Sequence, residues 1–247
     1  MERILGIDVG ATGIKGAVVN LEKGELTTER IKYPTPKPAT PQSMTEVMKQ
    51  LVSDFNWKGK PIGIGFPSII KNGVAHSASN IDDTWLDFPI EGFLNKKLKC
   101  PVKVINDADA AGLAEKKYGG GNDKQGLVIL LTLGTGIGSA LFYNGVLLPN
   151  TELGHLKWED SITEKYASNS ARENKELNFK TWGKELNRVL KHIEFILAPD
   201  HFIIGGGISK KFHKYSEYLK TDATIEPAKM LNNAGIVGAA LAFRLSD

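Results

Sequence analysis

Short apolar runs alternate along the chain with longer segments whose apolar residues recur every three or four positions. The short runs predict strands and the periodic segments predict helices. The predicted strands are residues 4–7, 17–20, 29–33, 61–66, 102–105, 127–131 and 201–204. The predicted helices are residues 43–55, 91–98, 108–118, 182–198 and 235–245, with one more opened by Gly205-Gly206-Gly207. Strand, turn, strand and helix patterns occur in both halves, which indicates a duplicated α/β arrangement rather than a solenoid.

The boundaries of these elements follow from local signals. Ser43 and Glu46 have the spacing of a capping box at the start of the predicted helix 43–55, after a connector rich in proline. The polar segment 158–179 has weak periodicity and receives no assignment. A division between the two halves is expected just after Asp107, although no low-complexity linker marks it.

Composition narrows the class of protein. The chain has 247 residues, a net charge of +3 and a single cysteine, Cys100. So small a positive charge does not indicate a nucleic-acid partner, but it is compatible with a polyanionic substrate. One cysteine excludes an internal disulfide and a zinc site built from cysteines.

One stretch without charged residues, 126–151, is long enough to span a bilayer. Its glycines and its Asn144-Gly145 pair favour strands joined by turns instead, since Asn-Gly is a strong hairpin signal. The chain begins with a strand pattern rather than a signal peptide. We therefore expect a cytoplasmic protein with no membrane partner.

Two turns rich in glycine and threonine each follow a predicted strand, within residues 8–16 and 132–138. Glycine lets a ligand approach the backbone closely, and free N–H groups suit phosphate oxygens. The candidate phosphate contacts are Gly10, Thr12, Gly13 and Lys15 in the first turn, Thr132, Gly134, Thr135 and Gly136 in the second, and Gly205, Gly206 and Gly207 between a strand and a helix. Two such turns predict two loops that hold one phosphate chain.

Two aspartates follow predicted strands and are candidates for chemistry. Asp8 could hold Mg²⁺, directly or through water, beside a phosphate; the alternative is an Asx turn. Asp107 lies at the carboxyl end of a strand, where α/β proteins usually bind ligands. It could orient a substrate hydroxyl and accept its proton, or it could simply cap the following helix.

Five motifs occur in the order and spacing of one family over nearly the whole chain. They are Asp8-Val-Gly-Ala-Thr, Asn106-Asp107-Ala-Asp-Ala-Ala, Leu133-Gly-Thr-Gly-Ile-Gly, Glu152-Leu-Gly-His155 and Ile204-Gly-Gly-Gly. The chain resembles ROK-family sugar kinases, which have an actin-like, hexokinase-type α/β fold. Residues 145–155 and 226–235 resemble bacterial polyphosphate glucokinases most.

The resemblance implies roles for particular residues. Asp107 would be the general base, and the sugar contacts would be Ser68, Asn80, Asn106, Asp107, Glu152 and His155. Many family members use this histidine in a zinc site, but the cysteines of that site are absent here, so no zinc is expected. The implied reaction moves a phosphoryl group from polyphosphate or ATP to the 6-hydroxyl of glucose, with Mg²⁺.

The resemblance also implies two domains and an oligomer. The small domain would comprise residues 1–107 and 235–247, and the large domain residues 108–234, with glucose bound between them. Family members are often homodimers. Basic residues Lys184, Arg188 and Lys191, or Lys210, Lys211 and Lys214, could guide polyphosphate, although such clusters are usually solvated helix faces.

Two alternatives remain open at this point. One is an ATP-dependent ROK hexokinase acting on glucose, mannose or an amino sugar. The other is a sugar-responsive ROK regulator, but we expect no nucleic-acid partner because the first strand begins near Ile4, with no helix-turn-helix pattern before it.

Overall fold

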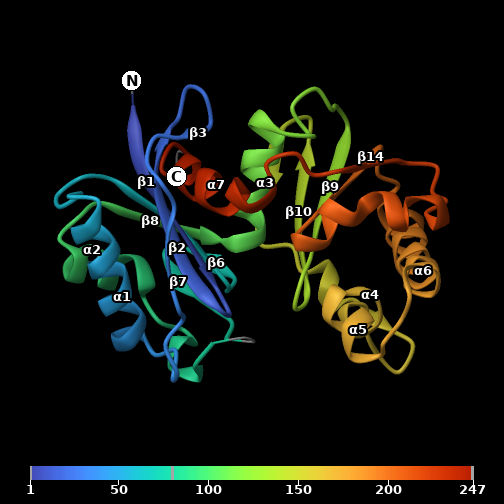
Figure 1. Cartoon of the computed structure of the whole chain (residues 1–247), viewed down its shortest axis with the longest axis horizontal. Helices are drawn as coiled ribbons and strands as arrows, with labels where there is room; N and C mark the ends of the chain where they lie inside the picture. Colours follow the sequence, from blue (N-terminus) through green and yellow to red (C-terminus); the bar gives the residue numbers. More distant parts are fainter. Residues whose placement is uncertain (1, 79–80, 246–247) are drawn as a thin grey trace. The chain divides into compact units, whose positions relative to one another are not determined.

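The computed structural model describes residues 2–78 and 81–245, and their contacts divide the chain into two compact units (Figure 1). Unit 1 comprises Met1–Ala114 and Asn233–Asp247, and unit 2 comprises Glu115–Asn232. Helix α3 (Asp107–Tyr118) crosses from one unit to the other, so the division by contacts falls inside a helix rather than at its start. None of the helices in the described ranges is long and apolar enough to cross a membrane.

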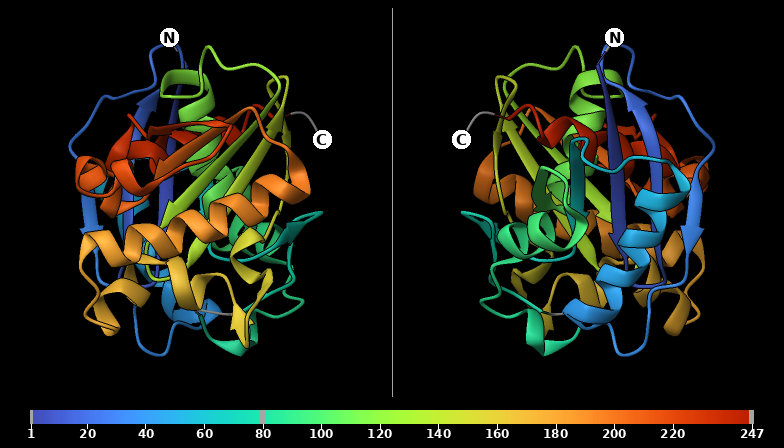
Figure 2. Two further views of the ribbon diagram at one scale, coloured as in Figure 1. Left: turned by 90° about the vertical axis from the view of Figure 1, so that its right-hand side faces the viewer. Right: turned by 90° about the vertical axis from the view of Figure 1, so that its left-hand side faces the viewer.

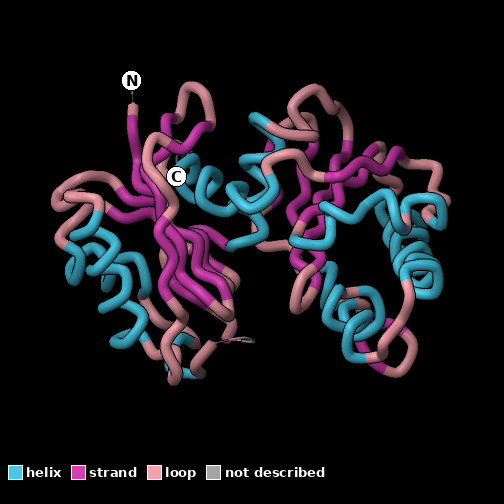
Figure 3. The backbone as a smooth tube through the Cα atoms, in the orientation of Figure 1, coloured by secondary structure: helices cyan, strands magenta, loops and turns pink. Residues whose placement is uncertain are grey.

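Unit 1 is built on a mixed six-stranded sheet, shown in magenta in Figure 3. The strand order is β3-β2-β1-β5-β8, and β4 also pairs with β2, at Ile14–Gly16, while β3 pairs with it at Val19 and Asn20. The bounds are β1 Arg3–Gly10, β2 Gly13–Asn20, β3 Glu25–Leu26, β4 Ile31–Tyr33, β5 Ile62–Phe66 and β8 Val102–Asn106. Because β1, β5 and β8 are parallel, their carboxyl ends bring the segments after Asp8 and Asn106 to the same edge of the sheet.

Helices cover both faces of this sheet. Helices α1 (Pro41–Asp54) and α2 (Ile90–Leu98) cover one face, and α7 (Ala234–Ala242) covers the other (Figure 1). Short elements complete the unit: β6 Ile70–Lys71, β7 Val74–Ala75 and the 3-10 helix η1 Asp83–Trp85. The helix that ends the chain therefore packs on strands from its beginning.

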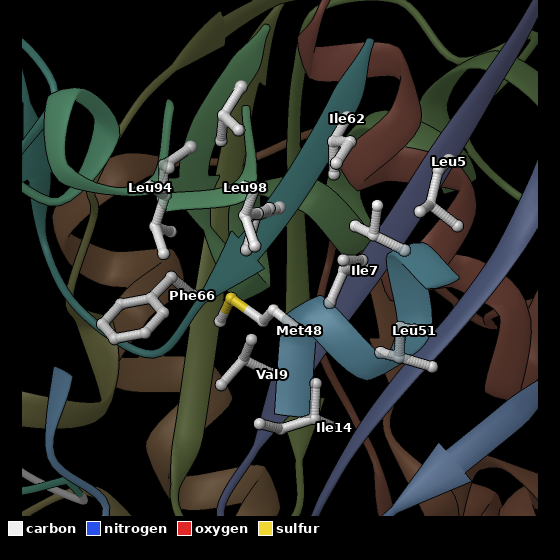
Figure 4. Close-up of a cluster of buried hydrophobic side chains, with 14 of the residues drawn as sticks. Leu5, Ile7, Val9, Ile14, Met48, Leu51, Ile62, Phe66, Leu94 and Leu98 are labelled. Carbon is white, nitrogen blue, oxygen red and sulfur yellow. The ribbon is translucent and has the colours of Figure 1, made fainter. Parts of the chain in front are cut away.

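Alternation along β1 explains this layering. Leu5, Ile7 and Val9 point into the core beneath α1 and α2, where Figure 4 shows them among Met48 and Leu51. Gly6 and Asp8, at alternate positions of the strand, face α7. Position 6 is glycine for a steric reason: a Cβ there would lie 2.0 Å from the carbonyl oxygen of Ile236, within α7.

Unit 2 contains a five-stranded sheet of order β11-β10-β9-β14-β15. The strands are β9 Leu127–Leu133, β10 Ile137–Tyr143, β11 Val146–Leu148, β14 His201–Gly205 and β15 Thr224–Pro227. Helix α6 (Phe179–Leu197) runs across one face of this sheet (Figure 2, left) and buries Leu186, Val189 and Leu190 there. The Asn144-Gly145 turn joins β10 to β11 as predicted, with both residues at positive φ.

The remaining elements of unit 2 are short. They are the strands β12 Lys157–Trp158 and β13 Ser161–Ile162, the helices α4 Glu164–Ala167 and α5 Asn169–Asn174, and the 3-10 helices η2 Leu153–His155, η3 Gly207–Lys214, η4 Ser216–Tyr218 and η5 Leu231–Asn233. Most of the segment that received no assignment from the sequence thus folds into a small hairpin and two single-turn or two-turn helices. Such short elements carry too few residues for a periodic pattern to emerge.

Two predicted details are wrong. The capping box of α1 is formed by Thr40 and Ser43, not by Ser43 and Glu46, and the helix begins at Pro41. Proline suits the first helical position because its missing N–H has no partner to lose there. The helix expected after the third glycine cluster is the 3-10 helix η3, which is kinked at Lys211.

Candidate functional site

The first glycine turn is tighter than the sequence suggested. Strands β1 and β2 stay paired up to Gly10 and Gly13, so only Ala11 and Thr12 form the turn, and both are exposed. Lys15 lies directly opposite Asp8 in the strand register, and its Nζ is 3.0 Å from Asp8 Oδ2. The predicted phosphate contacts of this turn are therefore gathered at one end of a hairpin.

Asp8 is also placed against helix α7. A Cβ built on Gly235, the second residue of α7, would lie 2.7 Å from Asp8 Cγ, so only glycine leaves room for the carboxylate there. The amino end of a helix carries partial positive charge and favours an anionic group. Asp8 thus lies between this helix end and the Lys15 ammonium.

Asn106 and Asp107 have different partners at the start of α3. The side-chain oxygen of Asn106 accepts hydrogen bonds from the N–H groups of Ala108 at 2.9 Å and Asp109 at 3.1 Å. Its side-chain nitrogen donates to the Ser68 carbonyl at 3.1 Å. Asp107 shares the Ala108 N–H at 2.9 Å and is half-buried, whereas Asn106 is buried.

One further predicted sugar contact, Ser68, is in the loop after β5. Ser68 is buried, and its hydroxyl donates to the Ser77 carbonyl at 2.7 Å and accepts from the Ser77 N–H at 3.1 Å. A sugar contact through this hydroxyl would have to replace one of these bonds. Asn80 lies outside the described residues.

The second glycine turn, in unit 2, joins β9 to β10. Strand β9 continues to Leu133, so Thr132 is a strand residue, and the turn consists of Gly134, Thr135 and Gly136. The Gly134 N–H donates to the Gly136 carbonyl at 3.0 Å, which closes the turn, and Thr135 is exposed at its tip.

The third glycine cluster lies beside this second turn. Gly205 pairs with Thr132 across β14 and β9. Position 206 requires glycine for two reasons. Its φ is 80°, which other residues rarely adopt, and a Cβ there would lie 2.5 Å from the Leu133 carbonyl oxygen. The structure therefore brings together two glycine clusters that are far apart in the sequence.

Glu152 and His155 form a pair at the two ends of one turn. Glu152 is the N-cap of the 3-10 helix η2 and His155 its last residue, and His155 Nδ1 is 3.4 Å from Glu152 Oε2. Burial raises the pKa of the Glu152 carboxyl above its ordinary value; His155 acts against this rise, and the nearby carboxylate of Glu164 adds to it.

Glu164 is a candidate site residue that the sequence reasoning missed. It opens α4, and its Oε2 accepts a hydrogen bond from the Ile137 N–H at 3.3 Å. A Cβ on Gly136 would lie 2.3 Å from that same oxygen. Glu164 thus joins the second glycine turn to the Glu152–His155 pair, but it lies in the segment whose weak periodicity gave no signal.

The basic residues proposed as polyphosphate guides on α6 are partly neutralised. Arg188 pairs with Glu159 and with Glu185, the latter at 3.1 Å, and its guanidinium lies 5.3 Å from the centre of the Trp158 ring. These partners favour a structural role for Arg188. Lys210, Lys211 and Lys214 are exposed on η3.

Comparison with known proteins identifies the family. The family model described as "ROK family" matches residues 4–164. The chain belongs to the ROK family. Polyphosphate glucokinase of Mycobacterium tuberculosis (strain CDC 1551 / Oshkosh) is 45% identical to this ROK protein over 238 residues, which cover 96% of this chain and 89% of that protein.

Solved structures match over the whole length of the chain. The crystal structure of inorganic polyphosphate/ATP-glucomannokinase from Arthrobacter sp. strain KM has a TM-score of 0.95 and 46% identity, covering 99% of both chains. A ROK family glucokinase from Streptomyces griseus, in complex with glucose and AMPPNP, has a TM-score of 0.80 and 23% identity, covering 97% of this chain and 98% of that one. The expected actin-like, hexokinase-type α/β fold is confirmed.

Proposed function

We propose that this ROK-family chain is a glucokinase that transfers a phosphoryl group from inorganic polyphosphate to the 6-hydroxyl of glucose. The observation that carries the proposal is its 45% identity, over nearly the whole chain, to a polyphosphate glucokinase. The geometry of the described residues fits this chemistry, since acid and glycine clusters suited to a sugar and a phosphate chain are present in both units.

Asp107 is the general base of this proposal. Its carboxylate would accept a hydrogen bond from the 6-hydroxyl and take the proton as the oxygen attacks phosphorus. Its position in the first turn of α3 favours the ionised form. Asn106 supports this site by fixing the helix start: it accepts the Asp109 N–H and shares the Ala108 N–H with Asp107.

The sugar contacts of unit 2 are Glu152, His155 and Glu164. A carboxylate and an imidazole accept and donate hydrogen bonds in fixed directions, which suits the ring of hydroxyls on a hexose. The His155 contact at 3.4 Å leaves Glu152 a second oxygen for glucose. The proposal requires these residues and Asp107 to act on the same glucose molecule.

The glycine turns hold the phosphoryl donor. Thr12 and Thr135 are exposed at the tips of the two turns and offer hydroxyls and N–H groups to phosphate oxygens. A magnesium ion would neutralise charge on the donor. Asp8 fits such an ion as a ligand through water, because Lys15 already occupies its Oδ2 and Mg²⁺ commonly keeps several waters beside one carboxylate.

ATP is a second candidate donor and mannose a second candidate acceptor. The related Arthrobacter structure is of a polyphosphate/ATP-glucomannokinase, at 46% identity. Both donors present a terminal phosphoryl group on a charged phosphate chain, so the glycine turns do not discriminate between them by themselves.

The deciding experiment measures glucose 6-phosphate with the purified chain, Mg²⁺ and either polyphosphate or ATP at equal phosphoryl concentration. Polyphosphate is expected to support turnover, and Asp107→Asn to abolish most of it with both donors. Mannose in place of glucose tests the acceptor. Absence of a phosphorylated hexose with either donor would contradict the proposal.

We also propose a homodimer, which the oligomerisation habit of the family supports. Light scattering after size-exclusion chromatography measures the mass in solution directly. A mass equal to one chain across a range of concentrations would contradict this part of the proposal.

A further inference from the structure

Lys32 lies next to the first glycine turn, although it is remote from the turn's motif in the sequence. Strand β4 pairs with β2 so that Lys32 stands directly opposite Lys15, which in turn stands opposite Asp8 on β1. Residues directly opposite one another in an antiparallel pair point to the same face of the sheet. Asp8, Lys15 and Lys32 therefore form a row across three strands on one face.

The stem of Lys32 extends across the glycine turn. A Cβ built on Gly13 would lie 2.4 Å from Cε of Lys32 and 3.4 Å from its Cδ, so the lysine occupies the space that any other residue at position 13 would fill. Gly13 is buried, while Lys32 itself is exposed. The ammonium, one bond beyond Cε, is thereby placed beside the turn.

The same segment is fastened to the turn a second time. The Thr35 hydroxyl donates a hydrogen bond to the Gly10 carbonyl at 2.6 Å. Gly10 and Gly13 are the paired residues that close the hairpin. Contacts from β4 and from Thr35, two residues after it, thus reach both sides of the two-residue turn.

The charges in this row do not balance. Asp8 forms an ion pair with Lys15 at 3.0 Å, and no carboxylate of the described residues forms an ion pair with Lys32. Two lysines directly opposite each other repel, and the amino end of α7 beside Asp8 adds partial positive charge. This face of the turn therefore has an excess of positive charge that an anion would neutralise.

We propose that Lys32 binds the phosphate chain of the phosphoryl donor, beside the first glycine turn. The inference rests on the proposed function and extends it to a residue outside the family motifs. A lysine that extends into solvent does not require a glycine at position 13. A lysine whose stem lies across the turn does, because a Cβ at position 13 would collide with that stem. The ammonium donates to phosphate oxygens, so Lys32 acts in donor binding and takes no part in proton transfer.

Three variants separate the charge from the shape. Lys32→Met keeps an apolar stem over Gly13 and removes the ammonium, Lys32→Arg keeps the charge, and Lys23→Met is the control, because Lys23 is exposed at the other end of the β2 strand. We expect Lys32→Met to raise the KM for polyphosphate about tenfold, the loss of one charged hydrogen bond. Its kcat and its KM for glucose should change less than twofold, and Lys32→Arg should recover most of the loss.

A double-mutant cycle tests the packing of Gly13 against Lys32. Gly13→Ala should raise the KM for polyphosphate because its Cβ displaces the lysine stem. In a Lys32→Ala background the same change should have a much smaller effect, since only the 3.1 Å approach to the Tyr33 carbonyl remains. Equal effects in the two backgrounds would contradict the packing argument.

Direct binding distinguishes this inference from the proposed function. Titration of the chain with polyphosphate by calorimetry, without glucose, needs no turnover. Weaker binding by Lys32→Met than by the wild type and Lys23→Met supports the inference even if glucose is not phosphorylated. Binding and KM unchanged in Lys32→Met would overturn it, whether or not the enzyme turns over.

Discussion

Asn106 accepts two N–H groups at the start of helix α3, and its neighbour Asp107 shares the first of them. The Asn106 amide oxygen accepts the N–H groups of Ala108 and Asp109, and its amide nitrogen is fixed by the Ser68 carbonyl. The sequence left open whether Asp107 caps the helix or acts on a substrate hydroxyl; in the structure Asn106 caps the helix. A buried asparagine stabilises the helix start, and a half-buried carboxylate stands next to it.

This division predicts different outcomes for the two substitutions. Asp107→Asn should lower kcat by a factor of about 10² to 10⁴, the usual contribution of a general base, with the Tm nearly unchanged. Asn106→Ala should instead destabilise the protein by about 1–2 kcal/mol through loss of the cap. Steady-state kinetics and thermal unfolding on both variants provide the comparison. Full turnover by Asp107→Asn would exclude it as the base.

The burial of Glu152 predicts that the stability of the protein depends on pH. Burial raises its pKa in the folded protein above the ordinary value of 4.5. As the pH rises from the pKa of Glu152 in the unfolded chain to its raised pKa in the folded protein, the unfolded chain releases the proton first. The free energy of unfolding therefore falls as the pH rises, and at neutral pH the ionised Glu152 destabilises the folded protein. Glu152→Gln should therefore have a higher Tm than the wild type at pH 7, with no difference near pH 4.

Under the proposed function the same substitution should also weaken glucose binding, because hydrogen bonds from sugar hydroxyls to a neutral amide are weaker than those to a carboxylate. Paired measurements of Tm against pH and of KM for glucose test both statements. The exposed Glu22→Gln is the matched control, for which neither quantity should move. A Tm difference that persists unchanged at pH 4 would show that the cost does not arise from ionisation.

Sequence pattern predicted the parts of the fold that are long or repeated. Strands β1, β5, β8 and β9 and helices α1, α3 and α6 all appear near their predicted places, and all of them except α3 contribute residues to the two hydrophobic cores. The start of α1 differs from the prediction because Thr40 and Ser43 form a reciprocal capping box, in which each side chain accepts a hydrogen bond from the other residue's N–H. Proline is tolerated in a helix only in its first turn. Because Pro41 belongs to a proline-rich connector, the sequence did not indicate that α1 begins there.

The candidate site was less visible in the sequence. The predicted strands made Asp8 and Asp107 candidates, because each follows one of them in the sequence, and the resemblance to ROK kinases added Glu152. Glu164 and Lys32 are visible only in the structure, since Glu164 belongs to a single-turn helix and Lys32 to a three-residue strand. Lys32 lies beside the first turn because of the pairing of β4 with β2, and both side chains occupy space that a Cβ on Gly13 or Gly136 would fill. The spacing of residues along the chain does not indicate either relationship.

Glu115 predicts a large structural effect away from the reacting groups. It is 1% exposed, and its two carboxylate oxygens accept hydrogen bonds from the N–H groups of Gly120, Lys229 and Met230, at 2.9, 3.0 and 2.6 Å. Removal of the Glu115 carboxylate leaves three buried N–H groups without a hydrogen-bond acceptor. Glu115→Ala should destabilise the protein by about 3–5 kcal/mol.

Chemical denaturation measures this loss. Glu115→Gln, which keeps one acceptor oxygen, should lie between the wild type and Glu115→Ala. Glu173→Ala, at an exposed position on α5, is the control and should change stability by less than about 0.5 kcal/mol. Equal stability of the wild type and Glu115→Ala would mean that water replaces the carboxylate without cost.

Gly63 and Gly92 predict opposite responses to the same change. A Cβ at position 63, in β5, would lie 1.8 Å from the Ala239 carbonyl oxygen, which belongs to the backbone of α7 and cannot move aside. Gly63→Ala should thus force α7 away from the sheet and cost about 3 kcal/mol or more. Gly92, in α2, has nothing within 4 Å of the same atom. Gly92→Ala should stabilise the protein by about 0.5–1 kcal/mol, because alanine loses less backbone entropy in a helix. Denaturation midpoints of the two variants give the comparison, and a stable, unchanged Gly63→Ala would contradict the close packing of α7 on β5.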